Sequence, residues 1–197
     1  MTKFMLFLFL ATLQLSLATD NCVKIEPQIR ESTEKIISSK YPYWYNVGLA
    51  RQETKCQWVS SLDGNGSVGY FQLTPKFLDP LLKPLYPDYT KPYSKDHFFA
   101  FSYYIKSLYN TTPSRKLFIV YQRYNGGDWI LKECKRAGVY EWDKCKQYCK
   151  RSLVCVWKVK GVCKQYQSAC DINYNYPVQV YHYGQKYKKG VDLFNFW

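Results

Sequence analysis

The chain has 197 residues, 47% of them hydrophobic and 19% aromatic, and its formal net charge is +13. This composition excludes a wholly disordered chain, and the length suits one domain with a sizeable core, or such a domain with a small appendage. The 20 tyrosines suit either a small tyrosine-rich core or a wet surface that packs against sugar rings or bases.

Residues 1–18 have the features of a secretory signal peptide. Lys3 precedes an apolar run from Phe4 to Leu17, and Ser16 and Ala18 are the small residues of a cleavage site. The run is shorter than the roughly 20 apolar residues that a membrane span needs. We therefore expect cleavage after Ala18 and an exported protein, periplasmic or extracellular, with no stable membrane insertion. An uncleaved anchor is the alternative.

Helical periodicity continues through most of the remaining chain. The predicted helices lie within 19–40, 43–59, 70–82, 97–109 and 115–127, with a last one that begins near Pro177. Glycine, asparagine, aspartate and serine predict a loop over 61–69. We expect a mainly α fold of the α+β type, one domain over 19–197, with a small β element or loop after the second helix.

Eight cysteines follow the cleavage site: Cys22, Cys56, Cys134, Cys145, Cys149, Cys155, Cys163 and Cys170. An even number in an exported chain predicts disulfides, and eight cysteines allow 105 connectivities. Six of them lie in the segment 134–170, which we expect to be stapled to the rest of the domain; a separate wall-binding module is the alternative. Zinc is disfavoured because no CxxC pair occurs and the chain has two histidines. We expect no metal and no cofactor.

Glu53 continues an apolar helix face, because it lies four residues after Leu49 and three after Ala50. The sequence therefore predicts that Glu53 is partly buried. Burial raises the pKa of a carboxyl group, as a general acid at neutral pH requires. The alternatives are a solvated glutamate or an ion pair with Arg51 or Lys55.

Three separated blocks carry a resemblance to a known family: "ARQET" at 50–54, "GYFQLTP" at 69–75 and "YNGG" at 124–127. In this order and at these separations they resemble the signature blocks of the soluble lytic transglycosylase and goose-type lysozyme superfamily. The resemblance covers roughly 43–127. It implies a lysozyme-like catalytic domain that cleaves the β-1,4 bond between N-acetylmuramic acid and N-acetylglucosamine in peptidoglycan.

The same resemblance assigns roles to single residues. It makes Glu53 the general acid that later acts as base, and it places Thr54 in a hydrogen bond near that acid. The residues that it implies for substrate binding are Thr54, Gly69, Tyr70, Gln72, Tyr124, Asn125, Gly127 and, through a fainter match at 176–187, Tyr183. Arg123 departs from the family pattern, which has alanine there. We expect its side chain to extend outward, with a substrate contact as the alternative.

The reaction product divides the family. In lytic transglycosylases the 6-hydroxyl of the sugar itself attacks and leaves a 1,6-anhydro end, and this is the outcome that we expect here. The segment "DGNG" at 63–66 also resembles a goose-type lysozyme loop, so Asp63 is a candidate for positioning a water in true hydrolysis. Alternatively, the Asp63 side chain only fixes the turn.

Removal of Lys3 with the signal peptide leaves 27 basic and 15 acidic residues, a net charge of +12. Such an excess attracts polyanions, although the basic residues are scattered and a solvated basic surface is an alternative. We expect peptidoglycan glycan strands as the partner, no nucleic acid because the protein is exported, and a monomer. An inactive cationic wall-binding protein and a membrane-disrupting protein are the competing functions.

Overall fold

The computed structural model describes residues 20–60, 66–87, 89 and 96–190, so the expected signal peptide and Asp63 lie outside the described residues. Within them the chain is mainly helical, with one two-stranded sheet. The helices are α1 (Asn21–Ile36), α2 (Tyr43–Thr54), α3 (Pro75–Leu85), α4 (Asp96–Thr111), α5 (Leu117–Gly126), α6 (Trp129–Ala137), α7 (Trp142–Gln147), α8 (Ala169–Gly184) and the 3-10 turn η1 (Gln185–Tyr187). The strands are β1 (Leu153–Val159) and β2 (Val162–Ser168).

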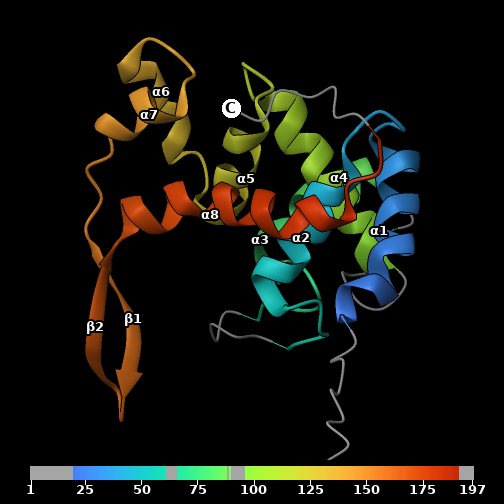
Figure 1. Cartoon of the computed structure of the whole chain (residues 1–197), viewed down its shortest axis with the longest axis horizontal. Coiled ribbons are helices and arrows are strands. Elements are labelled where there is room, and N and C mark those ends of the chain that lie inside the picture. Colours follow the sequence, from blue (N-terminus) through green and yellow to red (C-terminus); the bar gives the residue numbers. More distant parts are fainter. Residues whose placement is uncertain (1–19, 61–65, 88, 90–95, 191–197) are drawn as a thin grey trace, which may run out of the picture.

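Helix α2 runs through the core, with α1 and α8 packed against it (Figure 1). All residues from Tyr43 to Ala50 are buried, as expected for a helix that is covered on every side. The one strongly polar side chain among them, Asn46, donates to Thr33 Oγ1 at 3.0 Å and accepts from Tyr121 Oη at 2.9 Å. Satisfied hydrogen bonds offset the cost of burying this amide.

Two glycines let α2 and α8 approach closely. A Cβ atom at Gly48 would lie 2.1 Å from the Val180 carbonyl oxygen, and one at Gly184 would lie 2.5 Å from the Trp44 carbonyl oxygen. Any side chain at either position would collide with the backbone of the other helix. The contact therefore fixes the C-terminal half of α8 beside the N-terminal half of α2.

Helix α8 begins earlier than the sequence predicts. Its N-cap is Ser168, whose hydroxyl accepts from the Asp171 backbone N–H at 3.2 Å, and Pro177 lies inside the helix. The prediction of a start near Pro177 is thus wrong by two turns. Proline removes one helix hydrogen bond, but Asn173 and Tyr174 in the preceding turn are both buried, and this packing outweighs the local preference.

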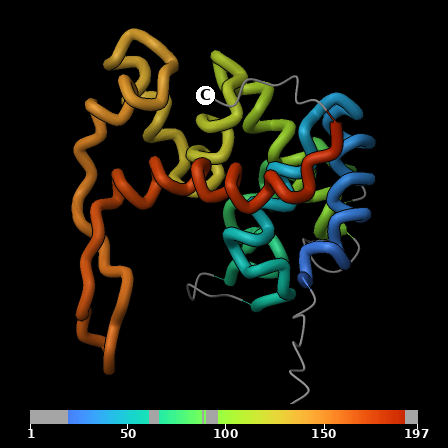
Figure 2. Tube along the Cα trace, in the orientation of Figure 1, coloured from blue at the N-terminus to red at the C-terminus, as the bar shows by residue number. Residues whose placement is uncertain are grey.

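The one sheet among the described residues lies within the cysteine-rich segment. Strands β1 and β2 form an antiparallel hairpin that projects away from the helices (Figures 1 and 2). In the described part of the loop that follows α2, only isolated bridges occur, which pair Val68 with Ser60 and with Leu73. The chain between Val59 and Val68 includes 61–65, of which the structure describes nothing.

All eight cysteines form disulfides: Cys22–Cys56, Cys134–Cys145, Cys149–Cys170 and Cys155–Cys163. This confirms a disulfide-stapled fold and fits an exported protein, since disulfides persist in oxidising compartments. Three of the four bridges join cysteines within 134–170, so they cross-link this segment internally and, contrary to our expectation, do not tie it to residues before Cys134. Within the described ranges, no helix is both long and apolar enough to span a membrane.

Candidate functional site

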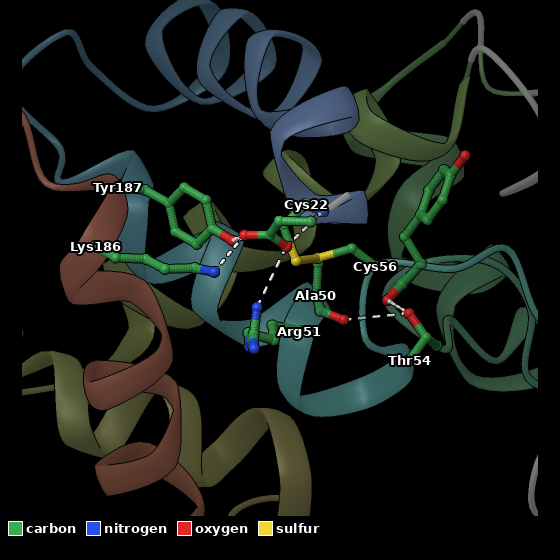
Figure 3. The surroundings of a disulfide bond; sticks show 9 residues. Cys22, Ala50, Arg51, Thr54, Cys56, Lys186 and Tyr187 are labelled. Carbon is green, nitrogen blue, oxygen red and sulfur yellow. Dashed lines mark hydrogen bonds and ion pairs between the residues drawn. A yellow bond between two sulfur atoms is a disulfide. The ribbon is translucent and has the colours of Figure 1, made fainter. Parts of the chain in front are cut away.

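Glu53 lies in the last turn of α2, which ends abruptly just after it. Lys55 and Cys56 have φ values of 55° and 58°, in the left-handed region that non-glycine residues rarely adopt. The Cys22–Cys56 disulfide ties this irregular segment to the first turn of α1 (Figure 3). The carboxyl group of Glu53 therefore sits on a rigidly held helix end, where the helix dipole is negative.

Two tyrosines surround the carboxyl group. The hydroxyl of Tyr176, on α8, donates a hydrogen bond to Glu53 Oε1. Burial raises the pKa of Tyr176 well above its usual value, and the negative charge of Glu53 raises it further. The same two causes, in the same order, raise the pKa of Tyr124 on α5. Both phenols thus stay protonated beside Glu53, and the Tyr176 hydroxyl fixes the carboxylate orientation.

Glu53 opens into a cavity of about 740 Å³ between the end of α2 and the first half of α8. The lining is rich in side-chain amides, and Asp171 is the one other carboxylate in it. The lining residues are Gln52, Glu53, Asn125, Gln167, Ser168, Asp171, Ile172, Asn175, Tyr176 and Gln179. Neutral donors and acceptors of this kind suit a neutral, hydroxyl- and amide-bearing ligand.

A second cavity of about 240 Å³ shares Asn125 with the first. It is lined by Gln72, Tyr124 and Asn125 together with residues of α3 and the segment before it. Asn125 lines both cavities and therefore lies between them, and we refer to the two cavities together as the groove.

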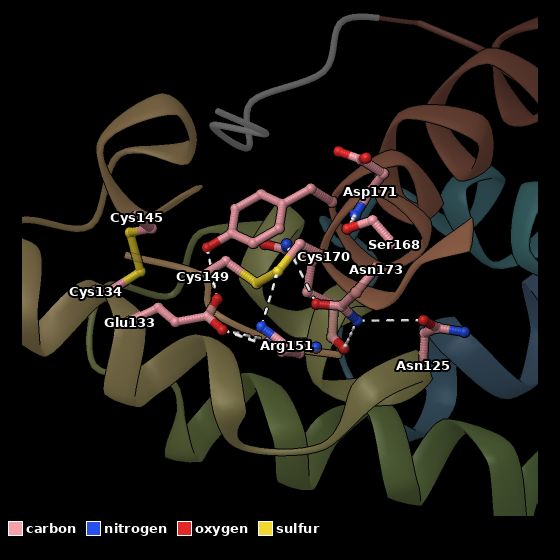
Figure 4. Close-up of polar contacts among 12 residues, drawn as sticks. Asn125, Glu133, Cys134, Cys145, Cys149, Arg151, Ser168, Cys170, Asp171 and Asn173 are labelled. Carbon is pink, nitrogen blue, oxygen red and sulfur yellow. Dashed lines mark hydrogen bonds and ion pairs between the residues drawn. A yellow bond between two sulfur atoms is a disulfide. The ribbon is translucent and has the colours of Figure 1, made fainter. Parts of the chain in front are cut away.

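Asn173 orients the Asn125 amide. The Asn173 Nδ2 atom donates to Asn125 Oδ1 at 3.2 Å and to the Gln122 carbonyl at 3.0 Å. Asn125 Oδ1 therefore faces α8, and its amide nitrogen points away from Asn173 (Figure 4). Asn125 thus offers an N–H donor to the groove. Gly126 makes room for this arrangement, because a Cβ atom there would lie 2.3 Å from Asn173 Nδ2.

The "GYFQLTP" block lies partly in the groove and partly behind it. Gln72 lines the smaller cavity, and its Nε2 atom donates to the carbonyls of Val59 and Gly69 at 3.1 Å each. Gly69 has a φ of +77° and packs against the buried His97 ring, which a Cβ atom would meet at 2.3 Å. Its close approach is thus to a histidine and not to a cavity.

Thr54 and Tyr70 hold the loop to the helix end. The Thr54 hydroxyl lies 2.9 Å from the Tyr70 carbonyl and 3.2 Å from the Ala50 carbonyl, and it can donate to either (Figure 3). The Tyr70 ring stacks on Phe98 at 5.6 Å between centroids. Neither Thr54 nor Tyr70 lines either cavity. Thr54 acts by positioning the loop that carries Gln72.

The structure separates Gly127 and Tyr183 from the groove lining. Gly127 caps α5 with a φ of 69°, which favours glycine. The Tyr183 ring lies under the Arg51 guanidinium, at 5.4 Å from its centroid. Arg51 also pairs with Asp20 at 3.3 Å and not with Glu53.

The expectation that Arg123 extends outward is wrong. Its side chain is buried and donates to the Leu108 carbonyl and the Thr112 hydroxyl, both at 2.9 Å, while its Nε pairs with Asp128 at 2.7 Å. These partners satisfy the guanidinium, so burial of its charge is compensated. Arg123 joins the end of α4 to α5 and holds the "YNGG" segment in place.

The sequence did not indicate Tyr176 and Asn173 as residues of the site. Both lie on α8, upstream of the expected helix start at Pro177, and their partners Glu53 and Asn125 are far away in the chain. A helix-period search through Pro177 would have placed Asn173, Tyr176 and Val180 on one buried face. Among the described residues, no group of three or more histidine, cysteine, aspartate or glutamate side chains could hold a metal ion.

Comparison of the chain with protein-family models, with curated proteins and with solved structures found no match.

Proposed function

We propose that this protein cleaves the β-1,4 bond between N-acetylmuramic acid and N-acetylglucosamine in peptidoglycan, with Glu53 as general acid and base. The observation that carries the proposal is the meeting of Glu53, Tyr124 and Asn125, from two of the three sequence blocks, with Tyr176 around one amide-lined groove. Gln72, from the third block, lines the adjoining cavity.

The proposed reaction is lytic transglycosylation, for which one carboxyl group suffices. Protonated Glu53 gives its proton to the glycosidic oxygen as the bond from C1 to that oxygen breaks. The resulting carboxylate takes the proton of the C6 hydroxyl as O6 bonds to C1. The products are a 1,6-anhydro end and a new free hydroxyl, no water is consumed, and Glu53 is protonated again.

The remaining residues of the groove bind and orient. The Tyr176 hydroxyl holds the Glu53 carboxyl in one orientation, which lowers the cost of reaching a reactive geometry. The amide nitrogen of Asn125 suits the carbonyl oxygen of an N-acetyl group. The amides of Gln52, Asn175 and Gln179 suit further sugar hydroxyls along the larger cavity.

Hydrolysis is the second candidate, because Asp171 gives the larger cavity a second carboxyl group besides Glu53. Asp171 pairs with Lys146 at 3.3 Å and remains largely exposed, so its carboxyl group is accessible to a water that it would orient. Asp63 is the other candidate for that role. A catalytically inactive wall-binding protein would use the same groove without proton transfer.

Masses of the products from purified peptidoglycan test the proposal. Anhydro-muramic ends support transglycosylation, and reducing ends alone support hydrolysis. With reducing ends, the variants Asp63→Asn and Asp171→Asn assign the water-positioning residue, since only the responsible variant loses activity. The absence of any soluble fragment from folded protein would contradict cleavage altogether.

A further inference from the structure

The hairpin formed by β1 and β2 exposes an unusual amount of apolar surface. Seven of the fifteen exposed large hydrophobic side chains among the described residues lie in these 16 residues, each between 38% and 65% exposed. They are Leu153, Val154, Val156, Trp157, Val159, Val162 and Tyr166. Exposed apolar patches that are concentrated in this way mark interaction sites more often than chance surface residues do.

These apolar side chains do not pack the hairpin against the helices. Both of its faces are exposed along nearly the whole length, and it projects away from the helices (Figures 1 and 2). The hairpin is stabilised internally. The Cys155–Cys163 disulfide joins the two strands, and Lys160 and Gly161, both at positive φ, form a tight turn. The apolar side chains are therefore available to a partner.

Every charged residue on the strands and turn of the hairpin is basic, while two basic residues near its base pair with carboxylates, Lys146 with Asp171 and Arg151 with Glu133. The segment 144–170 contains seven basic residues and no acidic one, and three lysines lie on the strands and turn: Lys158, Lys160 and Lys164. A second copy of the same chain would meet like charge at this surface. The positive charge favours an anionic partner, and the apolar side chains indicate the chemical class of that partner.

We propose that the hairpin binds the surface of an anionic lipid bilayer. Five of its seven exposed apolar side chains are aliphatic, and these gain nothing from sugar hydroxyls but gain from acyl chains. Trp157 and Tyr166 suit the headgroup level of a bilayer, and the lysines attract anionic headgroups. A glycan strand fits the amide-lined groove much better than it fits this surface.

Binding stays at the level of the headgroups. Each strand of a two-stranded sheet has one unpaired edge, and unpaired backbone groups cannot enter the hydrocarbon core without a large cost. The base of the hairpin also borders the groove, because Gln167 and Ser168 line the larger cavity. A bilayer bound by the hairpin would therefore lie close to the proposed catalytic groove.

Vesicle co-sedimentation tests this inference on the purified, disulfide-bonded protein. Vesicles of phosphatidylglycerol and phosphatidylethanolamine are expected to bind it at least about tenfold more tightly than phosphatidylcholine vesicles, and salt should weaken that binding. The double variant Trp157→Ser/Val162→Ser should lose about tenfold or more of the affinity for the anionic vesicles. Its control is Trp129→Ser, which removes a similarly exposed tryptophan from α6 and should change the affinity less than twofold.

Two further variants, each lacking two lysines, test whether positive charge on the hairpin contributes to vesicle binding. Lys158→Gln/Lys160→Gln should weaken anionic-vesicle binding by about tenfold or more, because each lysine near such a surface contributes about fivefold. Lys24→Gln/Lys40→Gln removes the same charge from exposed positions elsewhere and should have a much smaller effect. Far-ultraviolet circular dichroism should be unchanged in all four variants.

Three results would overturn the proposal. The first is equal binding to anionic and neutral vesicles, or to neither. The second is equal loss of vesicle binding in the hairpin and control variants. The third is vesicle binding that stays unchanged in the hairpin variants while another interaction is lost. Loss of sedimentation with insoluble peptidoglycan would assign the surface to glycan, and loss of self-association would assign it to a second copy of the chain. Glu53→Gln should bind vesicles normally, so failure of the proposed catalysis would leave this test unaffected.

Discussion

There is no room for a side chain at Gly48, where α2 passes α8, so Gly48→Ala should separate the two helices that hold Glu53 and Tyr176. The new Cβ atom would lie 2.1 Å from the Val180 carbonyl oxygen and 2.8 Å from the Gly184 nitrogen. Both are backbone atoms and cannot swing aside. Ordinary contact begins at 3.4 Å, so α8 must move by about 1.3 Å.

The stability cost combines two opposing effects. Overpacking of a core costs roughly 1–3 kcal/mol and occasionally more, while replacing a helical glycine by alanine contributes about 1 kcal/mol in the other direction. We expect a net loss of up to about 2 kcal/mol in the free energy of unfolding, measured by guanidinium titration. Displacement of Tyr176 from Glu53 should lower the rate of muropeptide release by about 100-fold, because a shift of about 1 Å can cost that much.

Gly138→Ala is the matched control. Gly138 is the C-cap of α6, with a φ of +74° and open space where a Cβ atom would lie, so alanine there meets backbone strain but no collision. It should lose about 1–2 kcal/mol of stability and keep its rate of peptidoglycan cleavage. Equal activity of the Gly48→Ala and wild-type proteins would refute the view that the close α2–α8 contact sets the geometry of the site.

Three further outcomes follow from the same contacts. Tyr176→Phe removes the hydrogen bond to Glu53 and should cost about 1–2 kcal/mol of stability and at least about tenfold in kcat, with little change in KM; an unchanged kcat would count against a positioning role. Asn173→Asp keeps the shape but can no longer donate to Asn125, so KM for a soluble glycan should rise about tenfold; an unchanged KM would show that the Asn125 orientation is unimportant. Burial and a hydrogen bond to a carboxylate raise the pKa of Tyr43 to about 12, so the unfolded chain ionises first as pH rises past 10; stability should fall by roughly 2–3 kcal/mol between pH 10 and 12, and a flat pH profile of unfolding would contradict this.

Local sequence patterns were sufficient to predict those features of the structure that depend on a few neighbouring residues or on composition. The apolar face that ends at Glu53 predicts its partial burial, and the glycines after Asn125 predict the end of α5. The even cysteine count in an exported chain predicts complete disulfide pairing. Neighbours within about one helical turn determine the first two features, and the disulfide prediction needs only the cysteine count and the oxidising compartment.

The remaining features depend on contacts between distant segments. Tyr176 meets Glu53 across 123 positions of the chain, and Asn173 meets Asn125 across 48. Burial of Arg123 depends on acceptors that α4 presents at its C-terminal end. The hairpin was missed because its strands lack the apolar and polar alternation of a half-buried sheet, and both faces are exposed.

Release of soluble fragments from purified peptidoglycan by wild-type protein and by Glu53→Gln tests the central claim most directly. The substitution keeps the size of the side chain, and the Tyr176 hydroxyl can still donate to its oxygen, so the variant should fold with nearly unchanged stability. We predict anhydro-muropeptides from the wild-type protein and a loss of at least about 1,000-fold in their release by Glu53→Gln. Equal release by the two proteins would contradict a catalytic role for Glu53.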